Sequence, residues 1–249
     1  QSGADNTLMA MEYGAVDFVA KPSGTISLDL HKIQDELVRK VVGASKISIS
    51  KLKKPLRSSL TSDQPLSKTF INEGPIDSIK TKPLQAFDSA IFKKTWEKTS
   101  KKVILIGTST GGPRALQEVI TNIPATVNAP ILIVQHMPAG FTKSLAMRLD
   151  QLSEVHVKEA EQGDILQKGT AYIAPGGYHL KLRKVGSTFA VELDQNEPPR
   201  SGHRPSVDVM FENVSQYSDF DKIAVIMTGM GYDGSKGLVS LKNTGNVIA

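Results

Sequence analysis

From Lys101 onward, the chain alternates apolar runs with amphipathic stretches, and this alternation constrains the fold more than any other feature. The runs VILIG (103–107), APILIVQH (129–136) and KIAVIMTG (222–229) are apolar through their centres. Strands that are buried on both faces have this composition, whereas strands with one wet face alternate polar and apolar residues. We therefore expect an α/β fold: a doubly wound, mostly parallel sheet with helices on both faces.

Helices and one insertion complete this prediction. The stretches 113–123, 141–152 and 235–245 carry helical apolar spacing, and Pro113 fits the first position of a helix because its missing N–H costs nothing there. The run 170–193 instead alternates around glycine-containing turns. That pattern predicts antiparallel hairpins inserted into the parallel architecture.

Residues 1–45 predict a helix, a short strand and a second helix. The first helix, over 5–13, ends at Gly14, a common helix stop, and the strand follows in 15–22. The second helix, over 29–42, has one apolar stripe, formed by Leu30, Ile33, Leu37 and Val41. Three such elements are too few to close a core alone, because a stripe of this kind needs a sheet to cover.

Residues 46–100 are rich in Ser, Lys and Pro and show no lasting period, which predicts a basic interdomain linker. The segment 46–102 holds 13 Lys and Arg against 5 Asp and Glu, a net charge of +8, while the whole chain carries +5. The rest of the chain is therefore negative. A basic linker without a folded basic face argues against nucleic acid binding.

Composition excludes several further classes of function. The chain has no cysteine, so it has no disulfide, no zinc–thiolate site and no cysteine nucleophile. No run approaches the ~20 apolar residues of a membrane span, and the first residues lack the pattern of a signal peptide. We therefore expect a cytoplasmic protein that does not insert into a membrane.

Ser109 lies in GTSTG (107–111), which fits the G-x-S-x-G turn that exposes a serine hydroxyl between a strand and a helix. A Walker-type phosphate loop needs Lys followed by Ser or Thr where this chain has Pro113 and Arg114, and a dinucleotide loop needs glycine at position 109. A nucleophile is the favoured reading. Simple anion binding at the helix start and a purely structural turn stay open.

A serine nucleophile needs a base and a group that orients the base. His136 ends one apolar run and Asp233 follows another, so both are predicted beside Ser109 at the carboxyl edge of the sheet. The alternatives are a backbone-bonded histidine and an aspartate in a turn or helix cap. The order Ser, His, Asp differs from the Ser, Asp, His order of α/β hydrolases.

Six stretches together resemble one family, the chemotaxis response-regulator protein-glutamate methylesterases (CheB). They are IGTSTGGP, QHMPAGFTKSLAMRL, VKEAEQGD, AYIAPGGYHL, HRPSVDVMF and MTGMGYDGSKGL, and they cover most of 102–249 in order. The resemblance implies a C-terminally truncated methylesterase domain over 101–249 with Ser109, His136 and Asp233 as its triad. It also implies the backbone N–H of Thr110 as an oxyanion donor, with no metal or other cofactor in catalysis.

The implied reaction is hydrolysis of glutamyl methyl esters on the cytoplasmic part of methylated chemoreceptors, with glutamine deamidation as a second activity. A catalytically inactive docking or signalling module is the alternative. The N-terminal YGAVDFVAKP resembles the end of a receiver domain, so 1–45 is expected to be a receiver fragment.

In this comparison Lys21 matches the receiver lysine that contacts the phosphoryl group. The acceptor aspartate and its Mg²⁺-binding acidic pocket belong upstream of residue 1. A histidine kinase would supply the phosphoryl group, and phosphorylation of the receiver would relieve a block on the catalytic cleft.

Overall fold

The computed structural model describes residues 2–21, 33–46 and 101–244, and the account below concerns these residues. Most of the predicted linker, 46–100, lies outside them. No helix in the described ranges is both long and apolar enough to cross a membrane.

A five-stranded parallel sheet forms the centre of residues 101–244, as the sequence predicted. Its strand order is β3-β4-β2-β1-β7, and every neighbouring pair runs parallel. The strands are β1 (Lys101–Thr108), β2 (Ile131–Gln135), β3 (His156–Glu159), β4 (Thr170–Ile173) and β7 (Phe220–Ile226). Since β1 and β2 lie side by side, the residues that follow them emerge together at one edge of the sheet.

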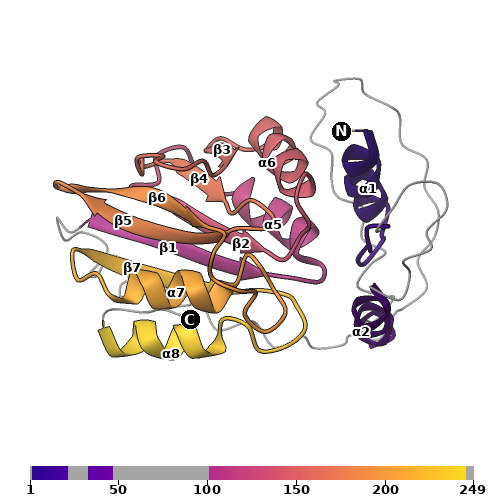
Figure 1. Cartoon of the computed structure of the whole chain (residues 1–249). Coiled ribbons are helices and arrows are strands. Elements are labelled where there is room, and N and C mark those ends of the chain that lie inside the picture. The colour runs from indigo at the N-terminus through magenta and orange to yellow at the C-terminus, as the bar shows by residue number, and fades with distance from the viewer. Residues whose placement is uncertain (1, 22–32, 47–100, 245–249) are drawn as a thin grey trace, which may run out of the picture. The chain divides into compact units, whose positions relative to one another are not determined.

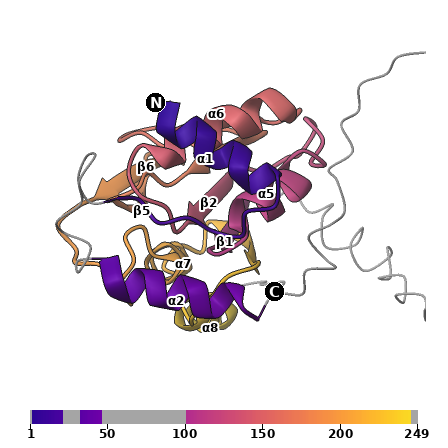
Figure 2. The ribbon, with the colours of Figure 1, turned by 90° about the vertical axis from the view of Figure 1, so that its right-hand side faces the viewer.

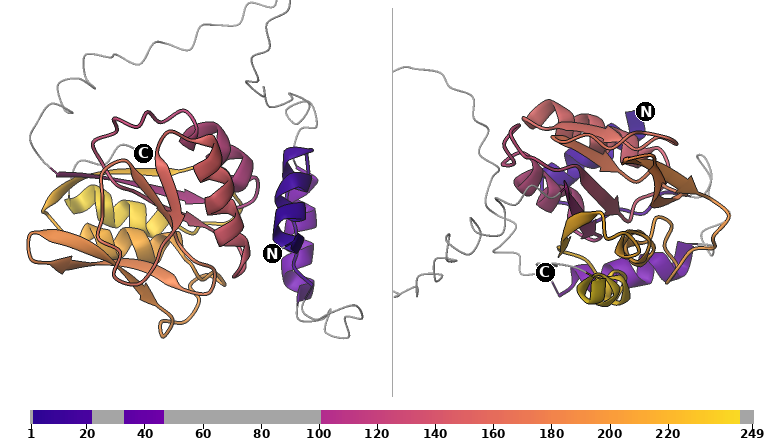
Figure 3. Two further views of the ribbon diagram at one scale, coloured as in Figure 1. Left: turned by 90° about the horizontal axis from the view of Figure 1, so that it is seen from above. Right: turned by 90° about the vertical axis from the view of Figure 1, so that its left-hand side faces the viewer.

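Helices cover both faces of this sheet (Figures 1 and 2). The helices α5 (Gly112–Ile120) and α6 (Phe141–Leu152) lie on one face, and α7 (Val207–Ser215) and α8 (Ser235–Thr244) lie on the other. Figure 3 shows α7 and α8 running side by side, in agreement with their extensive mutual contact. The doubly wound fold class is therefore confirmed.

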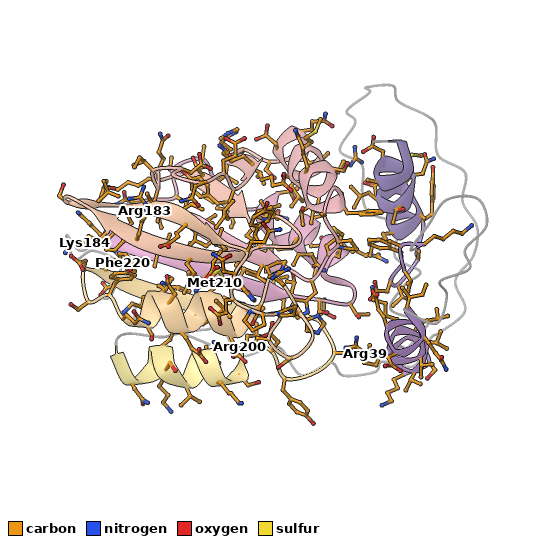
Figure 4. The ribbon with its side chains drawn as sticks, viewed as in Figure 1. Arg39, Arg183, Lys184, Arg200, Met210 and Phe220 are labelled. Carbon is orange, nitrogen blue, oxygen red and sulfur yellow. The ribbon has the colours of Figure 1, made fainter. Side chains whose placement is uncertain are left out.

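Two hydrophobic cores lie on opposite faces of the sheet because successive strand residues point to opposite sides. On β1, Leu105 joins the core beside α7, whereas Ile106 joins the core beside α5 and α6. The antiparallel hairpin of β5 (His179–Val185) and β6 (Thr188–Asp194) adds to the α7 core. In Figure 4, Met210 and Phe220 mark this core, while Arg183 and Lys184 lie near the turn that joins β5 to β6.

Two details of the strand prediction are wrong. Residues 170–173 belong to the parallel sheet as β4 and not to an antiparallel hairpin, because all four are buried and pair with β2 and β3. The edge strand β3 was not predicted. It is four residues long and only Val157 in it is buried, so it lacks an apolar run.

The N-terminal helix α1 (Ser2–Glu12) ends near the expected Gly14, whose φ of +107° suits glycine. It contacts α5 and α6, buries Leu8 in their core, and its Glu12 forms an ion pair with Arg148 at 2.7 Å. The strand predicted over 15–22 is wrong for the described residues 15–21, which are in no strand. A strand needs a hydrogen-bonded neighbour, and no described strand pairs with this segment.

The helix α2 (Gln34–Ala44) overlaps the predicted 29–42, of which 29–32 lie outside the described residues. The apolar stripe predicted on this helix is not covered in the structure, since Leu37 and Val41 are 46% and 59% exposed. The helix approaches the rest of the chain through Gly43 instead. A Cβ atom at position 43 would lie 1.6 Å from Met230 Sδ, so any larger residue there would have to displace the end of the Met230 side chain.

Candidate active site

Ser109 occupies a sharp turn directly after β1, and α5 begins three residues later at Gly112. The backbone N–H of Ser109 donates to the Thr228 carbonyl at 3.0 Å, and its own carbonyl accepts from the Gly112 N–H at 2.8 Å. Gly111 has a φ of +75°, a conformation that favours glycine. The turn is therefore fixed from both sides of the serine.

Gln135, the last residue of β2, holds this turn and was not singled out from the sequence. Its Nε2 donates to the carbonyls of Ser109 (3.0 Å) and His136 (3.1 Å), and its Oε1 accepts from Thr108 Oγ1 at 2.7 Å. A Cβ atom at Gly112 would lie 1.8 Å from that Oε1. The available signal was a polar residue at the end of a buried strand, where an amide must find partners.

His136 follows β2 directly, and its backbone N–H donates to the Thr108 carbonyl at 3.1 Å. The parallel register pairs Thr108 with Gln135, which brings Ser109 and His136 next to each other. The imidazole Nδ1 lies 3.1 Å from Ser109 Oγ, and Nε2 lies 2.7 Å from Asp233 Oδ2. The structure thus brings together all three residues predicted from the sequence.

The two ring nitrogens of His136 have the reverse of the roles they take in serine proteases, where Nε2 faces the serine. An ionised carboxylate only accepts hydrogen bonds, so Nε2 carries the proton that is donated to Asp233. Nδ1 then presents its lone pair to the hydroxyl of Ser109. Sequence could not supply this orientation, which depends on where the carboxylate lies relative to the ring.

Asp233 lies in the loop after β7, and its side chain is only 3% exposed. It sits at the start of α7 and accepts the backbone N–H groups of Val207 (2.7 Å) and Asp208 (3.0 Å). It also accepts the Ser206 hydroxyl at 2.7 Å. Burial by itself would raise the pKa of Asp233, but the hydrogen bonds from His136, Ser206 and the two N–H groups outweigh burial and lower this pKa to about 2.

Ser206 is the N-cap of α7, and a buried histidine holds this residue in turn. Ser206 Oγ accepts the Val209 N–H at 3.4 Å. His179 is fully buried; its Nδ1 accepts the Ser206 N–H at 3.2 Å, and its Nε2 donates to the Pro198 carbonyl at 3.2 Å. Burial lowers the pKa of His179, which keeps this ring neutral and Nδ1 able to accept.

Thr110, the predicted oxyanion donor, is buried at the start of the turn into α5. Its hydroxyl donates to Asp17 Oδ2 at 2.6 Å, and its carbonyl accepts from Thr228 Oγ1 at 3.0 Å. Within the described ranges, its backbone N–H has no hydrogen-bond acceptor. The oxyanion role of this N–H stays a prediction.

A cavity of about 780 Å³ opens beside Ser109 and His136. One wall comes from residues 101–244 and includes His203, Met230 and Tyr232. The other wall comes from the N-terminal residues and includes Asp17, Glu36 and Arg39. The resemblance implied a block of the catalytic cleft by the receiver part, but it did not indicate which N-terminal residues line the cavity.

Lys21 is exposed and is not among the residues that line this cavity, so its predicted role stays a prediction. In the part of the chain that is described, no group of three or more His, Cys, Asp or Glu side chains is placed to hold a metal ion.

The fold and site define a doubly wound α/β protein with a serine, a histidine and a buried carboxylate joined by hydrogen bonds at the carboxyl edge of its sheet. The sequence model of the CheB methylesterase family matches residues 104–249, and the chain belongs to this family. This finding confirms the resemblance seen in the sequence.

The names of similar proteins agree with this family assignment. A protein of Halalkalibacterium halodurans named protein-glutamate methylesterase/protein-glutamine glutaminase is 51% identical to this chain, and the match covers 97% of this chain and 61% of the relative. A protein of the same name from Bacillus subtilis is 44% identical, and the match covers 100% of this chain and 64% of that relative. The chain thus spans less than two thirds of these relatives. The crystal structure of the Thermotoga maritima CheB methylesterase catalytic domain is 48% identical, with a TM-score of 0.57 over 60% of this chain and 79% of that one.

Proposed function

We propose that this protein hydrolyses glutamyl methyl esters on chemoreceptors and also deamidates receptor glutamines. The observation that carries the proposal is the hydrogen-bond chain from Ser109 through His136 to Asp233, which opens onto the 780 Å³ cavity. The names of the relatives support the same pair of activities. Both reactions are acyl transfers at a glutamyl carbonyl, so one nucleophile serves both.

In the proposed mechanism, His136 Nδ1 takes the proton of Ser109 as Oγ attacks the ester carbonyl. The tetrahedral intermediate collapses when the Nδ1 proton passes to the leaving oxygen, and methanol departs. Water then attacks the acyl-serine and gives a proton to Nδ1. The second tetrahedral intermediate collapses as this proton returns to Ser109 Oγ, and the product leaves with a free carboxyl group. With a glutamine substrate, ammonia departs in place of methanol and the later steps are the same.

Charge placement supports these steps. The lowered pKa of Asp233 keeps its carboxylate ionised, so it stabilises the imidazolium that forms when His136 takes the proton. Thr110 lies two residues before α5, and the dipole of that helix favours a developing negative oxygen at its start. The side chains alone move the protons, so this route needs no cofactor.

We further propose that the N-terminal segment regulates the site after phosphorylation by a histidine kinase, with Lys21 contacting the phosphoryl group in the complete receiver. Two contacts support a block of the cavity by this segment. Asp17 accepts the hydroxyl of Thr110, the residue after the serine, and forms an ion pair with Lys40 of α2 at 3.2 Å. α2 itself lines the cavity.

The test is methanol release from receptor membranes that carry labelled methyl esters, with the complete protein and its Ser109→Ala variant. We expect Ser109→Ala to lose about 10³-fold or more of the rate, since nucleophile removal is among the costliest single changes. Ser215→Ala is the matched control, because Ser215 only donates to the Glu212 carbonyl near the end of α7. Equal release by Ser109→Ala and wild type would overturn the assignment of Ser109, and release at the background level by both would favour a docking role.

A further inference from the structure

His203 lies flat against the imidazole of His136. The two ring centroids are 3.8 Å apart and the ring planes differ by 8°. His203 also lines the cavity that opens at Ser109. Among the described residues, no hydrogen bond joins a ring nitrogen of His203 to protein, so the stack is the specific contact that its side chain makes.

Hydrogen bonds and ion pairs hold the backbone around His203, which fixes the point from which its side chain extends toward His136. Arg200 and His203 exchange both backbone hydrogen bonds, at 3.0 and 2.9 Å, across a two-residue turn. The two turn residues, Ser201 and Gly202, have φ values of +53° and +81°. Arg200 also forms ion pairs with Glu197, at 2.8 Å, and with Glu212 of α7. The turn is thereby tied to the helix that Asp233 caps.

His136 needs a third restraint beyond its two hydrogen bonds. The hydrogen bonds at Nδ1 and Nε2 oppose a tilt of the ring about its bond to Cβ only weakly, because a small tilt changes their lengths little. A flat group packed against one face opposes that tilt. The orientation of the Nδ1 lone pair toward Ser109 Oγ depends on the tilt, and proton transfer is sensitive to such geometry.

The stacked ring is uncharged at neutral pH. Burial, and next the charge that His136 takes on, lower the pKa of His203 to about 4. The charged groups that face it are His136 after β2, Asp233 after β7, and Arg39 and Glu36 on α2. An uncharged aromatic ring presents its negative π face to a neighbouring cation, which favours an imidazolium beside it.

We propose that His203 is a positioning residue for His136: its ring holds the imidazole in line with Ser109 and Asp233 and offers a π face to the positive charge formed during proton transfer. This inference rests on the proposed esterase function. It requires an aromatic ring at position 203 but not the nitrogens of histidine.

Two substitutions separate the ring from its nitrogens in the complete protein. His203→Ala removes the stacked surface, and His203→Phe keeps a flat ring that cannot hydrogen-bond. We expect kcat for methanol release to fall about 10- to 100-fold in His203→Ala, with KM changed by about threefold or less. We expect His203→Phe to recover most of this loss. His156→Ala is the control, since His156 is an exposed residue that pairs only with Asp150, at 2.9 Å.

A spectroscopic readout reports the same restraint without turnover. The Nε2 proton of His136, assigned by its loss in His136→Gln, should give a resolved proton NMR signal in wild type and His203→Phe. Exchange with water should broaden it in His203→Ala, because a tilting ring opens the bond to Asp233. Thermal unfolding of each variant shows whether a lower kcat or a broadened signal results only from loss of the folded state.

Wild-type kcat in His203→Ala would overturn the proposal, and so would a His203→Phe variant as slow as His203→Ala, which would point to the nitrogens. A sharp Nε2 proton signal in His203→Ala would also overturn it. If Ser109→Ala keeps full activity, the nucleophile assignment fails, and if wild type releases no methanol, the esterase function fails. In both cases the NMR signal still decides whether His203 holds His136.

Discussion

Replacing Asp233 with asparagine should cost both stability and activity, because one carboxylate serves α7 and His136 together. Its two oxygens accept four hydrogen bonds, from His136, Ser206, Val207 and Asp208. An asparagine side chain offers one acceptor oxygen and one NH₂ group. In either orientation, the NH₂ group faces a backbone N–H at the start of α7, which is then left unpaired.

The magnitude follows from the charge and from the lost bond. A pKa lowered from 3.8 to about 2 corresponds to about 2 kcal/mol of preference for the ionised carboxylate in the folded state. A buried N–H left unpaired costs about 1–3 kcal/mol, part of which is the same energy. We expect a loss of about 3 kcal/mol in unfolding free energy, which lowers Tm by about 6–12 °C at this chain length. Activity should fall by roughly 10⁴-fold, as in serine proteases whose orienting aspartate becomes asparagine.

The assay combines thermal unfolding from pH 7 to pH 2 with methanol release at pH 7. Because the folded-state pKa of Asp233 is lowered, its stabilisation is complete above the unfolded pKa near 4 and is lost as pH falls toward 2. The Tm difference between wild type and Asp233→Asn should therefore shrink over that interval. Asp219→Asn, an exposed partner of Lys184, should change Tm by about 2 °C or less. An unchanged Tm in Asp233→Asn, or a difference as large at pH 2 as at pH 7, would refute the reasoning.

Two further changes test the turn and the regulation. Gly112→Ala should lower the unfolding free energy by about 2 kcal/mol or more in denaturant titrations and should reduce kcat, because its Cβ would overlap Gln135 Oε1. Gly3→Ala is the control: Gly3 has open space around it, so this substitution should be neutral or slightly stabilising in the same titrations. Asp17→Ala in the complete protein should raise unphosphorylated methanol release by about two- to tenfold, because it removes the bond to Thr110 that holds the N-terminal segment at the cavity. The exposed Asp5→Ala is its control, and a rate equal to or below wild type in Asp17→Ala would contradict the proposed block.

The sheet and the meeting of Ser109 with His136 could be predicted because both follow from local pattern and parallel register. Doubly buried strands are apolar throughout, and the residues after two neighbouring strands must emerge side by side. Residues 170–173 have the same buried character, but the following alternation in 179–194 obscured it.

Other features depend on contacts that are distant in sequence. Asp233 caps a helix that starts 26 residues earlier at Val207, and nothing in either segment indicates the other. The stack of His203 on His136 joins residues from two loops. The contact made by α2 could not be predicted, because periodicity indicates only an amphipathic helix, whereas Gly43, the residue that makes the close contact, has no side chain to mark it.

The carboxylate of Asp233 also makes the reactivity of Ser109 depend on a local unfolding equilibrium. If the first turn of α7 opens, Val207 and Asp208 leave the carboxylate, and its position beside His136 is no longer fixed. The closed fraction of that turn therefore sets an upper limit on the fraction of molecules able to react. Amide hydrogen exchange at these two residues would measure this limit in the absence of any substrate.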